Sequence, residues 1–155
     1  MSRHGSLALL LVHIAFVGVA GVALAGWSPD GVTVRATTAR IPWVVACTDG
    51  GTGTFVVWQE ASSDPNGPLR VQHLLSTGDI DPTWPADGAL ASGVGVERDF
   101  VDVVPDRQGG VYVCWVESSG SMFLTRLDPS GQVAAGWPAS GKSLGAVNVA
   151  QGRPR

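Results

Sequence analysis

The chain has 155 residues, of which 45% are hydrophobic and only 15% charged, and its formal net charge is −3. It contains a single lysine, Lys142, and no cluster of basic residues. This composition lacks the electrostatic footprint of a nucleic-acid-binding protein, and it also disfavours binding to an anionic membrane surface.

Residues 1–25 have the layout of a secretory signal peptide. A positively charged start precedes an apolar run over 7–20, and Ala23-Leu24-Ala25 forms a small-x-small cleavage motif. A retained membrane anchor is the alternative, because the apolar segment is near the lower length limit for spanning a bilayer. The motif favours cleavage before Gly26. We therefore expect a secreted, periplasmic or cell-surface protein that is not held in the membrane after cleavage. The remaining chain is long enough for one domain with a core.

The remainder of the chain repeats itself. Segments return 57 positions later in the first part of the unit and 53 positions later in the second part, so the two copies differ by four residues in one loop. A fixed period of this size indicates modules that bury their apolar faces against their neighbours. The matching segments are 53–60 with 110–117, 74–78 with 127–131, and 84–88 with 137–141.

Short apolar runs bounded by Gly, Pro, Asn and Asp predict antiparallel strands joined by hairpins. Both second strands, 55–58 and 112–115, are continuously apolar, which indicates that both faces of each sheet are covered. Propeller blades meet this condition, whereas a two-sheet sandwich adhesin, the alternative, predicts in–out alternation. We therefore predict an all-β fold of two antiparallel four-stranded propeller-type blades, an incomplete β-propeller. The expected strands are 44–47, 54–60, 69–75 and a weak fourth from Ile80 towards Trp84, then 100–104, 111–117, 122–127 and a weak fourth from Gln132 towards Trp137.

The repeat sets the expected boundaries: 26–42 is the tail of a preceding blade and a lead-in, 43–95 the first blade, 96–148 the second, and 149–155 a truncated lead-in to another repeat. A closed ring needs at least about four blades. Three explanations remain open: the sequence is a fragment of a longer reading frame, copies assemble, or the two units pack as a compact pair. The end of the chain in mid-pattern favours a fragment.

One pattern runs through the second copy: Asp-x-x-Gly-Gly, an apolar run, Trp and an acidic residue, then Arg-Leu-Asp-x-x-Gly and Trp-x-x-x-Gly. It resembles the repeats of large secreted bacterial β-propeller proteins, and the resemblance covers residues 26 to about 148. The first copy departs from it at Thr52 and His73, which replace a glycine and the arginine. The resemblance implies a propeller scaffold and says little about activity. The pattern is carried by Asp106, Gly109, Gly110, Trp115, Glu117, Arg126, Leu127, Asp128, Gly131, Trp137 and Gly141.

Residues that recur in both copies are interpreted as structural, because a single reaction does not require them twice. The tryptophans are expected to pack between blades, the aspartates to form Asx turns, and the glutamates to satisfy nearby donors. The alternative for the glutamates, a glycoside-hydrolysing acid pair, needs carboxyls within about 5–10 Å of each other. These recurring positions are Trp58/Trp115, Trp84/Trp137, Asp49/Asp106, Glu60/Glu117 and the turn glycines Gly78/Gly131.

Few unique residues could support chemistry. Asp79 and Asp81 are weak candidates for calcium ligands, with surface-turn polarity as the preferred interpretation. His73, the only histidine after the signal peptide, is expected to be a polar rim group. Cys47 and Cys114 stand where the other copy has valine, so small buried residues are favoured and a disulfide stays open. The non-repeated loop around Asp64, Asn66 and Gly67 is the candidate binding loop.

The sequence thus favours an exported module with a non-enzymatic binding or structural role, and we expect no cofactor and no catalytic residue in it. The expected partners are further blades of the same chain, copies of itself, a glycan or a protein. The alternative is a propeller-scaffold enzyme, a glycan hydrolase or quinone-dependent dehydrogenase, whose catalytic residues lie in blades absent from this sequence.

Overall fold

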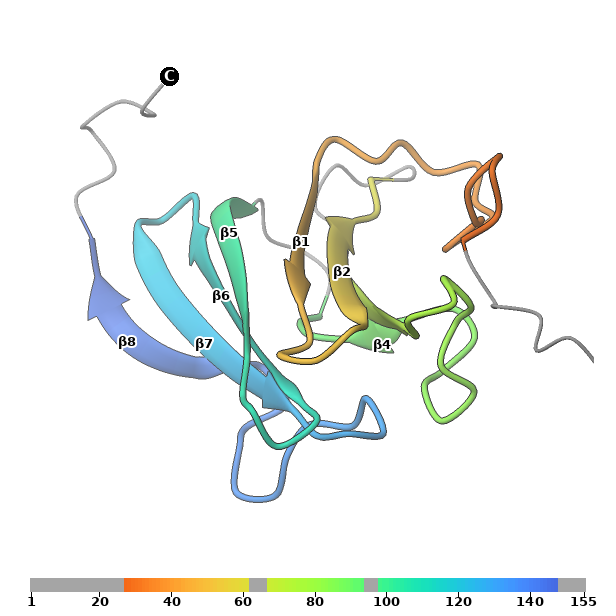
Figure 1. The fold of residues 1–155 in the computed structure, drawn as a ribbon. Coiled ribbons are helices and arrows are strands. Elements are labelled where there is room, and N and C mark those ends of the chain that lie inside the picture. The colour runs from red at the N-terminus through yellow and green to blue at the C-terminus, as the bar shows by residue number, and fades with distance from the viewer. Residues whose placement is uncertain (1–26, 62–66, 94–97, 148–155) are drawn as a thin grey trace, which may run out of the picture.

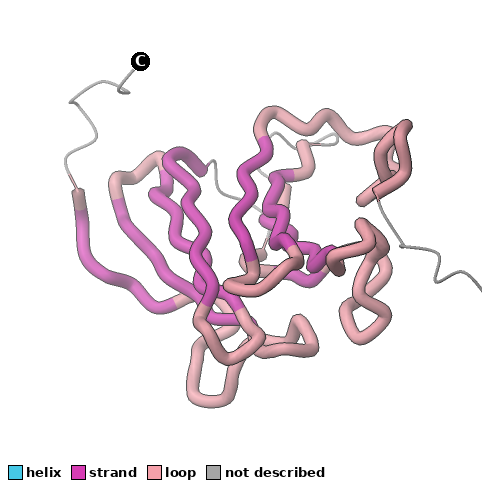
Figure 2. The backbone as a smooth tube through the Cα atoms, viewed as in Figure 1, coloured by secondary structure: helices cyan, strands magenta, loops and turns pink. Residues whose placement is uncertain are grey.

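A computed structural model of the chain describes residues 27–61, 67–93 and 98–147 (Figure 1). The expected signal peptide, the loop residues Asp64 and Asn66, and the segment 149–155 lie outside the described residues. The described part consists of strands and loops and contains no helix (Figure 2). The all-β prediction is therefore confirmed.

In the described part of the chain, eight strands form two separate antiparallel sheets of four strands each. Within each sheet the strands follow one another in chain order, so every connection is a hairpin or a longer loop between neighbours. The first sheet contains β1 (Val44–Thr48), β2 (Thr54–Gln59), β3 (Leu69–Leu74) and β4 (Ala89–Leu90); the second contains β5 (Arg98–Pro105), β6 (Val111–Glu117), β7 (Ser121–Leu127) and β8 (Lys142–Ala146).

The first three strands of each sheet lie close to their predicted positions, but the fourth strands do not. Ile80, where the first of these strands was expected to begin, forms only an isolated bridge to the end of β3. Val133, which follows the expected start of the second at Gln132, forms only an isolated bridge to the end of β7. Tight turns follow each bridge, and the prolines there lack the N–H that a ladder requires. The fourth strands instead begin after Gly88 and Gly141, both of which have positive φ. The predicted positions of the fourth strands were wrong, because turns follow Trp84 and Trp137 and each strand begins only after its turn.

The two sheets lie side by side, with β1 next to β5 (Figure 1). This pair makes the closest approach between the sheets, and β2 approaches β5 less closely. Sheets that are closest at their first strands bring side chains of β2, β3, β6 and β7 together in one core.

Alternate residues of the central strands build this core. From the first sheet, Phe55 and Val57 of β2 point into it, and from the second sheet Val111, Val113 and Trp115 of β6 do so. All five are buried. The remaining buried members of the core are Leu69, Val71, Trp84, Ala89, Ala91, Val103 and Leu127.

Because side chains alternate along a strand, the two sheets use non-equivalent faces in this contact. In the repeat, Val111 and Val113 correspond to Thr54 and Val56, whereas the core residue of β2 next to them is Phe55. The first sheet therefore contributes one face and the second sheet contributes the opposite one, as in a stack of units that all point the same way.

Candidate functional site

The contact between the sheets centres on Trp84, which is 4% exposed. Its Nε1 donates a hydrogen bond to the carbonyl oxygen of Pro129 in the second unit, at 2.9 Å. Its ring lies over Gly131, where an added Cβ would come within 2.9 Å of the indole Cε3. The ring also meets Phe55, with 5.5 Å between ring centroids. Trp84 thus joins the loop after β3 to the turn after β7.

Trp27 makes the corresponding contact one unit earlier. A Cβ added to Gly78 would lie 2.9 Å from Cδ2 of Trp27, and Gly78, like Gly131, has positive φ. The third tryptophan at this place in the repeat, Trp137, is half-buried and packs against Tyr112 at 5.8 Å between ring centroids. Among the described residues, two tryptophans therefore cover a turn glycine of the following unit, and the third stands at the end of the stack.

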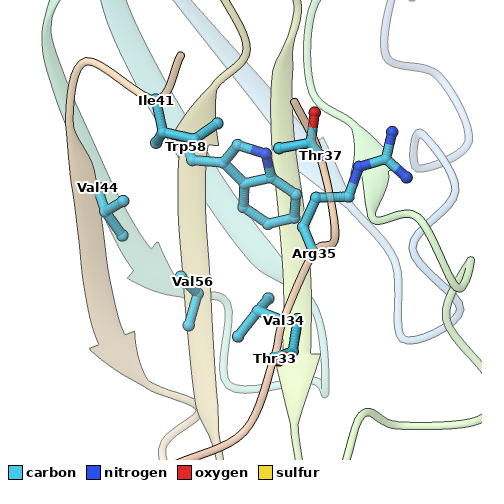
Figure 3. Close-up of a pocket in the computed structure, with 8 residues that line it drawn as sticks. All are labelled: Thr33, Val34, Arg35, Thr37, Ile41, Val44, Val56 and Trp58. Atoms are coloured by element: carbon cyan, nitrogen blue, oxygen red, sulfur yellow. The ribbon is translucent and has the colours of Figure 1, made fainter. Parts of the chain in front are cut away.

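The other face of the first sheet carries an apolar cavity of about 250 Å³. We call this surface the N-side face; it comprises Val44, Val56 and Trp58 together with residues 33–41, which cross it. Figure 3 shows Trp58 at the centre of the cavity, with Ile41 and Val34 on either side. Val44 remains 55% exposed, so the segment covers this face only in part.

Ion pairs hold this N-terminal segment on the sheet. Nε of Arg35 donates to Oε1 of Glu60 at 2.9 Å, and Arg35 also pairs with Asp87. Glu60 accepts a second bond from Arg70 at 3.0 Å. Burial opposes ionisation of Glu60, but the two guanidinium groups outweigh it and lower the pKa of this carboxyl. Glu60 was expected to satisfy nearby donors; the donors are Arg35 and Arg70, which sequence reasoning did not identify.

The far surface of the second sheet, which we call the outer face, consists of Val104, Tyr112, Cys114, Leu124 and Trp137. The first four line a shallow cavity of about 90 Å³ with Asp102 and Val103. Val104 is 50% exposed, and the other four are half-buried.

Each residue of the outer face has a counterpart in the first unit that lies within or against the core. Phe55, Val57, Val71 and Trp84 are buried there, and Cys47 packs against them. They correspond to Tyr112, Cys114, Leu124, Trp137 and Val104 respectively. Equivalent positions are therefore covered in the first sheet and partly open in the second.

His73 lies between two carboxylates. Its Nδ1 is 2.8 Å from Oδ2 of Asp81, and its Nε2 is 3.2 Å from Oδ2 of Asp49. Because a carboxylate only accepts, His73 donates to both when both ring nitrogens carry a hydrogen. Arg126 holds the equivalent position in the second unit, where Nε and Nη2 donate to Oδ2 of Asp106 at 2.8 and 2.6 Å. A nitrogen-bearing side chain at this position that bonds to the hairpin aspartate is thus common to both units.

These aspartates also organise the hairpin turns. Oδ1 of Asp49 accepts from the N–H groups of Gly51 and Gly53, and Oδ1 of Asp106 accepts from those of Gln108 and Gly110. Burial opposes ionisation of Asp106, but the Gln108 N–H, Arg126 and the Gly110 N–H together lower its pKa. The pKa of Asp49 is lowered against burial in the same way by Gly51, His73 and Gly53.

The remaining candidate residues are dispersed. Trp115 stacks on Phe123 with 5.7 Å between ring centroids and lies over Gly141, while Trp58 lies over Gly88. Trp115 belongs to the core cluster that both sheets share, whereas Trp58 lies on the N-side face. Glu117 stands opposite Arg98 in the register of β5 and β6.

The calcium candidates already have protein partners. Asp79 accepts from Thr77, and Asp81 accepts from Thr83 as well as bonding to His73. Within the described ranges, no group of three or more His, Cys, Asp or Glu side chains is placed to hold a metal ion. Of the predicted binding loop, only Gly67 is described; its carbonyl accepts from Gln59 and Arg98.

Both cysteines are free thiols. Cys47 packs against the core between the sheets, whereas Cys114 belongs to the outer face. Partial burial raises the pKa of each thiol, and the charge of nearby Asp102 adds to this effect on both, although a hydrogen bond with the Asp102 backbone opposes it at Cys114.

Comparison with known proteins gives no match: no family model fits the chain, and no curated protein or solved structure is significantly similar to it. Among the described residues, no helix has the length and apolar character needed to cross a membrane.

Proposed function

We propose that this chain is an exported β-propeller-type repeat module with a non-enzymatic binding or structural role at the cell surface or in the periplasm. In this proposal the two sheets are neighbouring blades of a larger ring, and residues 26–42 are the tail of a preceding blade and a lead-in. The remaining blades come from further repeats of a longer chain or from copies of this one.

The observation that carries the proposal is the way in which one unit contacts the next. Trp84 of the first unit lies over Gly131 of the second unit, and its indole N–H donates a hydrogen bond to the Pro129 carbonyl of that unit. Trp27 lies over Gly78 in the same manner. A contact that recurs from unit to unit is the defining property of a repeat architecture, in which each module is stabilised mainly by its neighbours.

Two further features support blades over a sandwich. The sheets approach most closely at their first strands, as blades do around an axis. Both are meanders in which strand order follows chain order, which matches the four-stranded sheet of a propeller blade.

In a propeller of this kind, specificity resides in loops that the repeat does not share. The loop around Asp64, Asn66 and Gly67 is four residues longer than its counterpart near Ser118. We therefore propose this loop as the place where a glycan or protein partner binds.

The test uses the chain purified in the form that the cell exports. Mass spectrometry should find its N-terminus at Gly26, and a full-length cytoplasmic chain would contradict export. The exported chain is then tested on an array of surface glycans beside a variant whose loop is shortened to the length of the Ser118 loop. Retention that is lost in the variant, with the glycan recovered unchanged, supports the proposal. Turnover of a retained glycan would instead indicate an enzyme.

A further inference from the structure

We propose that the outer face of the second sheet binds the N-side face of the first sheet in a second copy of this chain, so that copies associate head to tail. The inference rests on the proposed blade arrangement. It names a second copy of the chain as the partner of both ends of the two-sheet stack. It concerns the surfaces at Val104 and Val44, which lie at opposite ends of the stack.

The contact inside the chain shows what kind of surface fits the outer face. There, Phe55 and Val57 on one face of β2 share a core cluster with residues of β6 that belong to the opposite face, among them Val113 and Trp115. In the repeat, Tyr112 and Cys114 of the outer face correspond to Phe55 and Val57.

The N-side face offers the complement. Val56 and Trp58 correspond to Val113 and Trp115, and they line the cavity of about 250 Å³ on that face. The N-side face of a second copy therefore corresponds to the side of the second sheet that faces the core. It can cover the outer face in the way that the second sheet covers the first sheet within one chain. Contacts between two different faces are heterologous, and they can continue from copy to copy until a ring closes.

Exposure at both ends agrees with this pairing. Val104 is 50% exposed and Val44 is 55% exposed, although each belongs to a strand whose opposite side chains pack against the core. Contiguous exposed apolar patches mark interaction sites. Val104 adjoins Tyr112, Cys114 and Leu124, and Val44 adjoins Val56 and Trp58, so each belongs to such a patch.

The tryptophans indicate how the second copy is seated. Trp137 stands where Trp84 stands in the first unit, and Trp84 covers Gly131 of the next unit. In a second copy the corresponding glycine is Gly78, which that copy's own Trp27 already covers while remaining 50% exposed. Trp137 of one copy therefore takes the place of Trp27 in the other, so the copy's own N-terminal segment competes with the association.

The experiment uses sedimentation equilibrium of the exported chain and of two single variants, Val44→Asp and Val104→Asp. Both side chains are about half exposed, so the variants should fold, and circular dichroism checks this; Val44→Ser and Val104→Ser serve as milder versions. The wild-type chain should associate as its concentration rises. Each Asp variant should weaken association at least about tenfold, because the contact would bury an unpaired charge.

Mixing the two variants distinguishes a head-to-tail contact from other modes. Each variant retains one intact face, so an equimolar mixture should form a one-to-one heterodimer and stop there. Trp27→Ala should tighten wild-type association, whereas the same change at Trp137 should weaken it.

Several results would overturn the inference. A wild-type chain that stays monomeric would overturn it. An equimolar mixture of the two Asp variants that stays monomeric would also overturn it. Val44→Asp associating as strongly as the wild type would show that two outer faces pair with each other. Weaker or unchanged association in Trp27→Ala would remove the proposed exchange of tryptophans. None of these results bears on the arrangement of the two sheets within one chain, which stability measurements on the monomer test separately.

Discussion

Replacing Trp84 or Trp137 with alanine tests the stacking of the two units directly. The residues occupy equivalent places in the repeat, but a following unit covers only the first of them in this structure. The same substitution should therefore have different costs at the two positions.

The magnitudes follow from their contacts. Trp84 is 4% exposed, packs against Phe55 and hydrogen-bonds to Pro129. Truncation of a buried tryptophan costs about 3–5 kcal/mol of unfolding free energy. Trp137 is half-buried and meets Tyr112, so its truncation should cost about 1–2 kcal/mol. Trp84→Phe keeps most of the ring contacts and loses the indole N–H, which should cost about 1–2 kcal/mol.

The assay is urea denaturation followed by circular dichroism, at a protein concentration low enough to keep the chain monomeric. A tryptophan that carries the contact between units should give a clearly larger loss at 84 than at 137. Equal losses at the two positions, within about 0.5 kcal/mol, would refute the reasoning, because coverage by the second unit would then add nothing.

Three further predictions concern stability and use the same denaturation assay. Gly131→Ala should cost about 2–4 kcal/mol and Gly136→Ala only about 1 kcal/mol, because both have positive φ but only the first would press a Cβ against Trp84; similar costs would contradict that contact. His73→Arg should change stability by less than about 1 kcal/mol, whereas His73→Leu should cost about 2 kcal/mol because it leaves two part-buried carboxylates without their shared partner. Equal effects of the two substitutions would show that the bridge contributes nothing. Asp106, whose pKa is lowered in the folded chain from its ordinary 3.8, should contribute stability that is fully present above about pH 4 and lost as pH falls through the folded pKa. Asp106→Asn should reduce the dependence of the free energy of unfolding on pH in the acid range. An unchanged dependence would contradict the hydrogen bonds from Gln108, Gly110 and Arg126 to this carboxylate.

The strand pattern was largely readable from the sequence. Short apolar runs bounded by turn residues located the first three strands of each sheet, because hairpin chemistry is local. The fourth strands were misplaced, since Ile80 and Val133 have suitable side chains but enter turns whose hydrogen bonds the sequence does not show. Turn geometry overrode the apolar pattern at those two positions.

The candidate sites were predictable only where the contacts are short in sequence. Asp49 binds backbone N–H groups two and four residues away, and such a contact follows from residue type and spacing. The bridge of His73 to Asp49 and the pair of Arg35 with Glu60 cross 24 and 25 positions. One signal for the first was available in the sequence: His73 replaces Arg126 of the other copy, and both face the hairpin aspartate.

By itself, the sequence determined that the chain is built of strands and that tryptophans and glycines return at matching places, because these properties depend on residue type and order. Only the tertiary structure decided which face of each sheet is covered, because that depends on what lies beside the strand in space. Phe55 and Tyr112 are equivalent in sequence; the first is buried because a second sheet follows it, and the second stays partly open at the end of the stack.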